Sequence, residues 1–266
     1  MEDSTTKPFA VVTGASSGIG YELAKQFAQN DFDLLVTSTG PDINQAARDF
    51  EQLGAQVETV QANLASYEGV ETLYAKIKAT GRPVDAVAIN AGVGVGGPFV
   101  ETDLQEEINL INLNVISSVH LTKRVVQDMV ARGSGGILFT SSIAALMPGP
   151  FEAVYAASKA FIQSFAEALR NELKDTGVTV TAFQPGPTDT NFFHRAGMDD
   201  TRAGSGKKDD PAQVARQGFE ALMEDKDKII TGSLSTKIQG AATKVMPDKL
   251  AAEQHRKLSE PGSGKE

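Results

Sequence analysis

Short apolar runs alternate with amphipathic stretches along most of the chain, and this alternation restricts the possible fold more than any other feature. Several runs are apolar at nearly every position, as expected of strands that helices cover on both faces. The order of strand and helix predicts an α/β fold with a doubly wound, parallel, seven-stranded sheet of the Rossmann type. We expect the strands at residues 9–14, 33–39, 56–62, 85–92, 136–142, 178–185 and 228–232.

The stretches between these runs have helical periodicity. The expected helices cover residues 18–30, 43–54, 70–81, 103–132 and 153–175. A chain of 266 residues that is 41% hydrophobic is long enough to form such a fold as a single domain. We assign residues 1–236 to this domain, with a substrate loop at 190–211, and residues 237–266 to a helical tail with a disordered end.

Charge and cysteine content exclude several classes of function. The formal net charge is −9, which opposes binding to the phosphates of nucleic acids. The chain has no cysteine, so disulfides, thiolate catalysis and cysteine-ligated metals are excluded, and the three scattered histidines predict no metal site. No stretch reaches the ~20 apolar residues that a membrane span needs, and the first residues lack the apolar segment of a secretory signal. We therefore expect a soluble, cytoplasmic protein.

The sequence VVTGASSGIG places three glycines between the first expected strand and the first expected helix. Gly14, Gly18 and Gly20 would let a ligand approach the backbone, and the N–H groups of a helix N-terminus favour an anion. The spacing differs from the common Gly-x-Gly-x-x-Gly fingerprint, and no Lys-Ser/Thr follows as in a P-loop. A tight turn alone would also explain the glycines. Their position at the first strand-to-helix connection favours a dinucleotide site.

Tyr155 and Lys159 are four residues apart in AVYAASKAF and therefore share one helix face. This spacing is also typical of an exposed polar pair. The pKa of an unperturbed tyrosine is about 10, and an ammonium group one turn away favours the phenolate and lowers that pKa. Such an acid could donate a proton to the alkoxide that forms when a ketone accepts a hydride.

With these residues the chain resembles the short-chain dehydrogenase/reductase family, in its classical branch, from about Phe9 to Thr190. Two positions depart from the family pattern: Asn63 stands in place of Asp, and Ile89 replaces the first Asn of Asn-Asn-Ala-Gly. The motifs that carry the resemblance occur in the family's order and are Thr13-Gly14-x-x-x-Gly18-x-Gly20, Asn63-Leu64, Asn90-Ala91-Gly92, Asn114, Ser142, Tyr155-x-x-x-Lys159 and Pro185-Gly186-x-Thr188-x-Thr190.

The resemblance implies a catalytic set of Asn114, Ser142, Tyr155 and Lys159. In the family, the serine orients the substrate oxygen, the lysine also holds the nicotinamide ribose, and the asparagine holds a water that relays protons. Taken alone, Ser142 is also typical of a strand-end serine bonded to its own backbone, and Asn114 of a buried, hydrogen-bonded amide.

The residues after the second expected strand bear on the choice of cofactor. NAD sites usually place an acidic residue there, whereas this chain has Ser38 and Thr39, which could donate to a 2′-phosphate. The arginine often seen in NADP enzymes is also missing, so we expect NADP and leave NAD open. The expected cofactor-binding residues are Gly14, Ser16, Ser17, Gly18, Ile19, Gly20, Ser38, Thr39, Asn63, Leu64, Asn90, Ala91, Gly92, Tyr155, Lys159, Pro185, Gly186, Thr188 and Thr190.

The expected walls of the substrate pocket are residues 93–99, residues 144–151 and the loop after Thr190. Their large apolar side chains favour an apolar pocket, although such side chains also pack cores and lids; they are Met147, Phe151, Phe192 and Phe193. No basic residue is obviously aimed at a carboxylate or phosphate. We therefore expect a small neutral ketone, aldehyde or alcohol as the substrate.

The resemblance implies an NADP-dependent carbonyl reductase or alcohol dehydrogenase that uses tyrosine as the proton donor and acceptor. A non-enzymatic, dinucleotide-binding redox regulator and an NAD-preferring alcohol dehydrogenase remain alternatives. A sugar-nucleotide epimerase would need a longer C-terminal domain. The helices over 103–132 and 153–175 could pair across a two-fold axis, as in relatives, which predicts a homodimer or homotetramer, with the dimer favoured.

Overall fold

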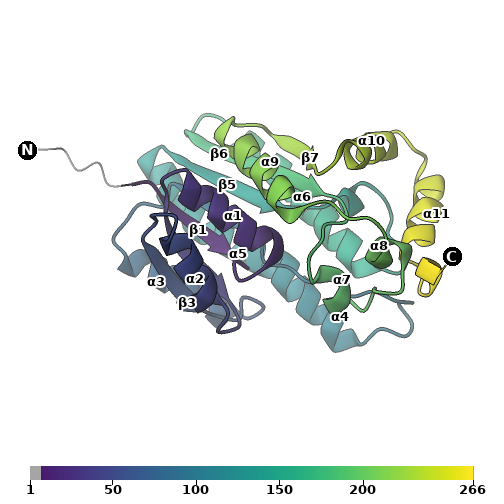
Figure 1. The fold of residues 1–266 in the computed structure, drawn as a ribbon. Helices are drawn as coiled ribbons and strands as arrows, with labels where there is room; N and C mark the ends of the chain where they lie inside the picture. Colours follow the sequence, from purple (N-terminus) through teal and green to yellow (C-terminus); the bar gives the residue numbers. More distant parts are fainter. Residues whose placement is uncertain (1–6, 266) are drawn as a thin grey trace, which may run out of the picture.

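The computed structural model of the protein describes residues 7–265. Its centre is a parallel sheet in the order β3-β2-β1-β4-β5-β6-β7 (Figure 1). The strands are β1 (Phe9–Thr13), β2 (Asp33–Ser38), β3 (Val57–Gln61), β4 (Ala86–Ile89), β5 (Gly135–Thr140), β6 (Val178–Pro185) and β7 (Lys228–Thr231). The expected fold class and the seven expected strands are confirmed. The strand order reverses between β1 and β4, and ligands of such sheets bind beside the carboxyl ends of the strands at this reversal.

The central strands are buried on both faces, which explains their unbroken apolar sequence. Successive side chains of a strand point to opposite faces, so Val11 joins one hydrophobic core while Ala10 and Val12 join the other. Each fully buried Val, Leu, Ile or Phe contributes about 1.5–3 kcal/mol, so the two cores hold the strand ends in a fixed register.

Helices cover both faces of the sheet (Figure 1). Side chains of α1, α2 and α9 pack in one core, and side chains of α3, α5 and α6 pack in the other. Within residues 7–265, no helix has the length and apolar character needed to cross a bilayer. The helices of the sheet layers are α1 (Gly18–Gln29), α2 (Ile43–Glu51), α3 (Tyr67–Ala79), α4 (Leu104–Ile111), α5 (Ser117–Arg132), α6 (Ala153–Glu172) and α9 (Pro211–Met223).

The expected helix over 103–132 is interrupted. A π-helical segment, η1 (Asn112–Ile116), separates α4 from α5. A π-turn inserts an extra residue and is frequent at functional sites. Here it contains Asn114, one of the expected catalytic residues.

Further helices lie after β5, in the substrate loop and towards the C-terminus. They are η2 (Ile143–Leu146) after β5, α7 (Phe192–Arg195) and α8 (Arg202–Ser205) in the loop, and α10 (Leu234–Thr243), α11 (Asp248–Ser259) and η3 (Ser263–Lys265) in the tail. Asp209 ties the loop to α10, since its carboxylate accepts hydrogen bonds from the Ser233 N–H at 3.0 Å and the Thr236 hydroxyl at 2.6 Å.

The end of the tail differs from the disordered end that the sequence predicts. Gly262 N–H donates to the Asp200 carboxylate and Gly264 N–H to the Asp200 carbonyl, each at 2.8 Å. These bonds fix residues 260–265 against the substrate loop, and the two segments lie side by side in Figure 1. Glu266 lies outside the described residues.

Candidate active site

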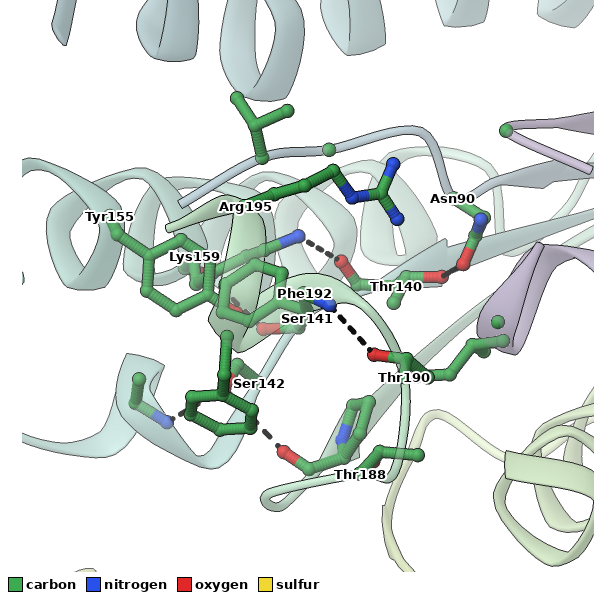
Figure 2. Close-up of a pocket in the computed structure, with 18 of the residues that line it drawn as sticks. Asn90, Thr140, Ser141, Ser142, Tyr155, Lys159, Thr188, Thr190, Phe192 and Arg195 are labelled. Carbon is green, nitrogen blue, oxygen red and sulfur yellow. Dashed lines mark hydrogen bonds between the residues drawn. The ribbon is translucent and has the colours of Figure 1, made fainter. Parts of the chain in front are cut away.

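One pocket brings the glycine turn and most of the expected site residues together (Figure 2). It lies at the carboxyl ends of β1, β4, β5 and β6, beside the reversal of strand order. All expected catalytic and cofactor-binding residues line it except Asn63 and Asn114. The resemblance therefore identified a set of residues that are distant in sequence and adjacent in space.

The glycine turn has the geometry of an anion site. Gly14 and Gly18 have φ values of 68° and 59°, which only glycine adopts without strain. The N-cap residue of α1, Ser17, makes no side-chain capping bond. The N–H groups of the first helical turn are therefore available to a phosphate, and they fit the pyrophosphate of a dinucleotide.

Asn90 connects the glycine turn to β5. Its Nδ2 donates to the Thr13 carbonyl at 3.0 Å, and its Oδ1 accepts from the Thr140 hydroxyl at 3.1 Å (Figure 2). A Cβ atom on Gly20 would overlap both the Gly14 carbonyl oxygen and Asn90 Nδ2. The absence of a side chain at Gly20 thus permits α1 to start directly against the end of β4.

The expected adenosine end of the pocket is only partly as predicted. Ser38 and Thr39 line it, and Ser38 Oγ donates to the Gly40 carbonyl at 3.1 Å. Asn63 does not line the pocket, because its Oδ1 accepts from the Ala65 N–H at 3.0 Å in a local turn. Asn63 is therefore not positioned for the predicted contact with an adenine ring. Its neighbours Ala62 and Leu64 form this part of the pocket wall instead.

Ser142 lies two residues beyond the end of β5. Its Oγ accepts from the Ala144 N–H at 3.1 Å, so Ser142 also caps the short helix that follows β5. The Ser142 hydroxyl also acts on Tyr155, where it partly offsets the effect of burial by lowering the pKa of the phenol. Ser142 is therefore bonded to nearby backbone, as the alternative interpretation of the sequence held, and it also acts on Tyr155.

Lys159 is buried and Tyr155 is partly buried on the face of α6 that borders the pocket. Burial raises the pKa of Tyr155, and the Glu152 carboxylate raises it further. Burial lowers the pKa of Lys159 to about 8. Lys159 Nζ donates to the Thr140 carbonyl at 2.9 Å and is 5.8 Å from the centre of the Tyr155 ring.

These positions bear on the expectation that Lys159 lowers the pKa of Tyr155. Burial and Glu152 dominate the pKa of the phenol, and Lys159 is not among the groups that shift it. The physical reason is the direction of Nζ, which bonds to the end of β5 rather than to the phenol oxygen. The pair is brought together as predicted, while the predicted direction of the pKa shift is wrong for this arrangement.

Asn114 is a buried, fully engaged amide behind the pocket wall. Its Nδ2 donates to the Val93 carbonyl at 2.9 Å and to Ser158 Oγ at 3.1 Å, while Oδ1 accepts from the Val93 N–H at 3.0 Å. A Cβ atom on Gly92 would lie 3.1 Å from Asn114 Oδ1 and 3.4 Å from Lys159 Nζ. The amide and the ammonium group therefore approach the same side of Gly92.

Several pocket residues were not expected from the sequence. Glu152, Gln239, His255, Leu258 and Ser259 line the pocket, and most of them belong to the tail. Glu152 carries the one local signal, a carboxylate just before the helix that presents Tyr155. The tail residues have no such signal, because helix α11 meets α6 about a hundred positions further along the chain.

Three residues of α7 complete the wall: Phe192, Phe193 and Arg195. The rings of Phe192 and Tyr155 have centroids 5.1 Å apart, and Figure 2 shows Phe192 beside Tyr155. Phe192 was expected as an apolar wall. Arg195 also lines the pocket, and its Nε donates to the Asn191 carbonyl at 3.4 Å. A basic group in the pocket was not expected.

Known proteins are similar to this chain in sequence and in fold. The short chain dehydrogenase family matches residues 8–200. The chain is 30% identical over 215 residues to an NADP-dependent 3-hydroxy acid dehydrogenase of Salmonella typhi, covering 80% of this chain and 86% of that protein. It is 36% identical over 179 residues to a very-long-chain 3-oxoacyl-CoA reductase of Neurospora crassa, covering 65% of this chain and 53% of that protein.

A solved structure agrees with these matches. A short-chain dehydrogenase from Sphingobium yanoikuyae, determined in complex with NADPH, superposes with a TM-score of 0.78 at 26% identity and covers 84% of this chain and 87% of that one. The family match spans the sheet from β1 to β6 and includes every residue of the expected catalytic set. The chain therefore belongs to the short chain dehydrogenase family.

Proposed function

We propose that the protein is an NADP-dependent oxidoreductase that interconverts a ketone or aldehyde and the corresponding alcohol, with Tyr155 as proton donor and acceptor. The observation that carries this proposal is the single pocket that contains the glycine turn together with Ser142, Tyr155 and Lys159. A bound nicotinamide supplies or accepts the hydride.

Each catalytic side chain has a distinct role in the proposal. Ser142 donates a hydrogen bond to the substrate oxygen and orients it. Because the pKa of Tyr155 is raised, its phenol carries a proton at neutral pH, as the donor of a reduction must. The Lys159 ammonium group offsets the negative charge that the phenol acquires after it gives up that proton. The amide of Asn114 is engaged by Val93 and Ser158 and does not line the pocket, so the water-holding role that the family implies for Asn114 stays a prediction.

NADP fits this pocket better than NAD. No carboxylate directly follows β2 to bind a ribose 2′-hydroxyl. Ser38 and Thr39 line the pocket there, and in the proposal their hydroxyls bind a 2′-phosphate, with Ser38 exchanging its bond to the Gly40 carbonyl for one to the phosphate. The names of two similar proteins also support this choice, since the Salmonella relative is NADP-dependent and the Sphingobium structure contains NADPH.

We also propose a homodimer. The loop before α4, helices α4 and α6, and the π-helical segment between α4 and α5 expose several large apolar side chains, and pairing across a two-fold axis would bury them. The exposed residues are Phe99, Leu104, Ile108, Ile111, Ile116 and Phe161.

The first prediction concerns the proton donor. Tyr155→Phe keeps the ring and removes the hydroxyl, so kcat for ketone reduction should fall by about 10²–10⁴-fold. The Kd for NADPH, measured by fluorescence titration, should stay near the wild-type value. Near-normal turnover in this variant would contradict the role of Tyr155. Wild-type protein that binds NADPH tightly and reduces no ketone of a broad panel would favour the redox regulator.

The second prediction concerns cofactor choice. Ser38→Asp places a carboxylate where the 2′-phosphate is expected, so the ratio of kcat/KM for NADPH to that for NADH should fall at least about tenfold. Ser235→Asp adds the same charge at an exposed position outside the pocket and serves as the control. An unchanged ratio in Ser38→Asp would mean that the 2′ site lies elsewhere.

The third prediction concerns the stability cost of Lys159. Its folded pKa of about 8 lies below the ordinary 10.5, so unfolding takes up a proton between these pH values. The buried charge is costly below pH 8, and the cost fades as pH rises towards 10.5. Lys159→Met should therefore raise the free energy of unfolding at pH 7 by roughly 2 kcal/mol, and by less at pH 9.5.

Urea denaturation at both pH values measures this difference, with Lys174→Met as the exposed control. A variant that is less stable than wild type at pH 7, or whose gain is the same at both pH values, would refute the cost assigned to the buried ammonium group.

The fourth prediction concerns assembly. Sedimentation equilibrium should give twice the chain mass of 28.1 kDa for the wild type. Phe161→Asp places a charge in the proposed interface and should yield monomers, whereas Val245→Asp, at a residue 85% exposed on the tail, should leave the dimer intact. A monomeric wild type would rule the interface out.

A further inference from the structure

Three polar side chains outside the expected catalytic set meet in the wall of the pocket. Glu152 precedes the first turn of α6, and His255 and Ser259 belong to α11. Oε2 of Glu152 accepts from the Ser259 hydroxyl at 2.8 Å and lies 3.1 Å from Nε2 of His255. The three residues are 6%, 6% and 2% exposed, and all of them line the pocket. The three side chains therefore form a buried, hydrogen-bonded polar cluster.

The cluster does not have the arrangement of a hydrolytic triad. In such a triad, the acid and the serine bind opposite nitrogens of the imidazole ring. Here Glu152 and Ser259 both contact Nε2 of His255, and Ser259 lies 3.2 Å from that nitrogen. His255 and Ser259 instead converge on one carboxylate oxygen and fix the orientation of the Glu152 side chain.

The other carboxylate oxygen of Glu152 remains available. Oε1 has no hydrogen-bond partner within residues 7–265, and it is not one of the fully buried unpartnered atoms of that part of the chain. Because Glu152 lines the pocket and is otherwise buried, this oxygen opens to the pocket. Glu152 is the N-cap residue of α6, three residues before Tyr155.

The surroundings of this oxygen make it selective. The lining of the same pocket includes the apolar side chains of Met147, Phe192 and Leu258. A carboxylate oxygen can only accept hydrogen bonds, and leaving it without a donor in an apolar pocket is costly. A ligand that brings a donor to this point gains the hydrogen bond and removes that cost.

We propose that Glu152, held by His255 and Ser259, is a substrate-binding subsite that accepts a hydrogen bond from a hydroxyl group close to the reacting carbonyl. The subsite rests on the proposed function and narrows its substrates to hydroxyketones and the corresponding diols. His255 and Ser259 are positioning residues, because they act through the Glu152 carboxylate.

The test compares ketones of equal size that differ only in a hydroxyl. Hydroxyacetone is paired with 2-butanone, and 4-hydroxy-2-butanone with 2-pentanone, and kcat/KM is measured for each with NADPH. The wild type should prefer the hydroxyketone by at least about tenfold in one pair. The readout is the ratio within a pair, so a general loss of activity in a variant does not obscure it.

Substitutions within the cluster test whether it causes the preference for the hydroxyketone. Glu152→Leu should bring the ratio close to one, and His255→Phe or Ser259→Ala should lower it mainly through a higher KM for the hydroxyketone. Glu152→Gln retains an acceptor oxygen and should keep part of the preference. Glu253→Leu makes the same change at an exposed position of α11 and should keep the wild-type ratio.

Four outcomes would overturn the subsite. Equal reduction of both members of each pair would refute it while leaving the proposed function intact. A preference that survives in Glu152→Leu would place the hydroxyl elsewhere. If aminoacetone is preferred over hydroxyacetone and Glu152→Gln abolishes that preference, the subsite binds a cation instead. Failure to reduce any ketone would overturn the proposed function, and the subsite with it.

Discussion

A continuous hydrogen-bonded connection from the glycine turn to α6 is the constraint on which the site depends. Asn90 bonds to the end of β1 and to the Thr140 hydroxyl, and the Thr140 carbonyl accepts from Lys159. The connection forms only because Gly20 lets the start of α1 lie against Asn90. The anion site and the buried ammonium group are therefore positioned by one set of strand ends, and a displacement of β4 or β5 would move both.

The same burial that positions Tyr155 and Lys159 sets their protonation. It raises the pKa of the phenol and lowers that of the ammonium group, so each side chain is biased towards its neutral form. Glu152 adds to this bias on the phenol. The apolar surroundings of the pair, rather than attraction between the two groups, therefore set these pKa shifts.

The family resemblance implied the catalytic set. Local sequence patterns predicted the sheet and the glycine turn, because strand burial and turn glycines are encoded within a few residues. They did not predict the π-helical segment at Asn114, since one inserted residue leaves the helical periodicity nearly unchanged. The resemblance also implied that Asn63 lies in the pocket. Its Oδ1 instead accepts from the Ala65 N–H, and Asn63 does not line the pocket. The contact between Glu152 and His255 joins positions 103 residues apart, which no local pattern records.

The family match ends before the tail that forms part of the pocket wall. Residues 8–200 include the glycine turn and all four expected catalytic residues, whereas α10 and α11 lie beyond that range. The tail is held over the pocket by Asp209 at α10 and by Asp200 at its end, so its side chains are fixed relative to Tyr155. The pocket thus combines residues inside the family match, Glu152 among them, with His255 and Ser259 of α11, which lie outside it.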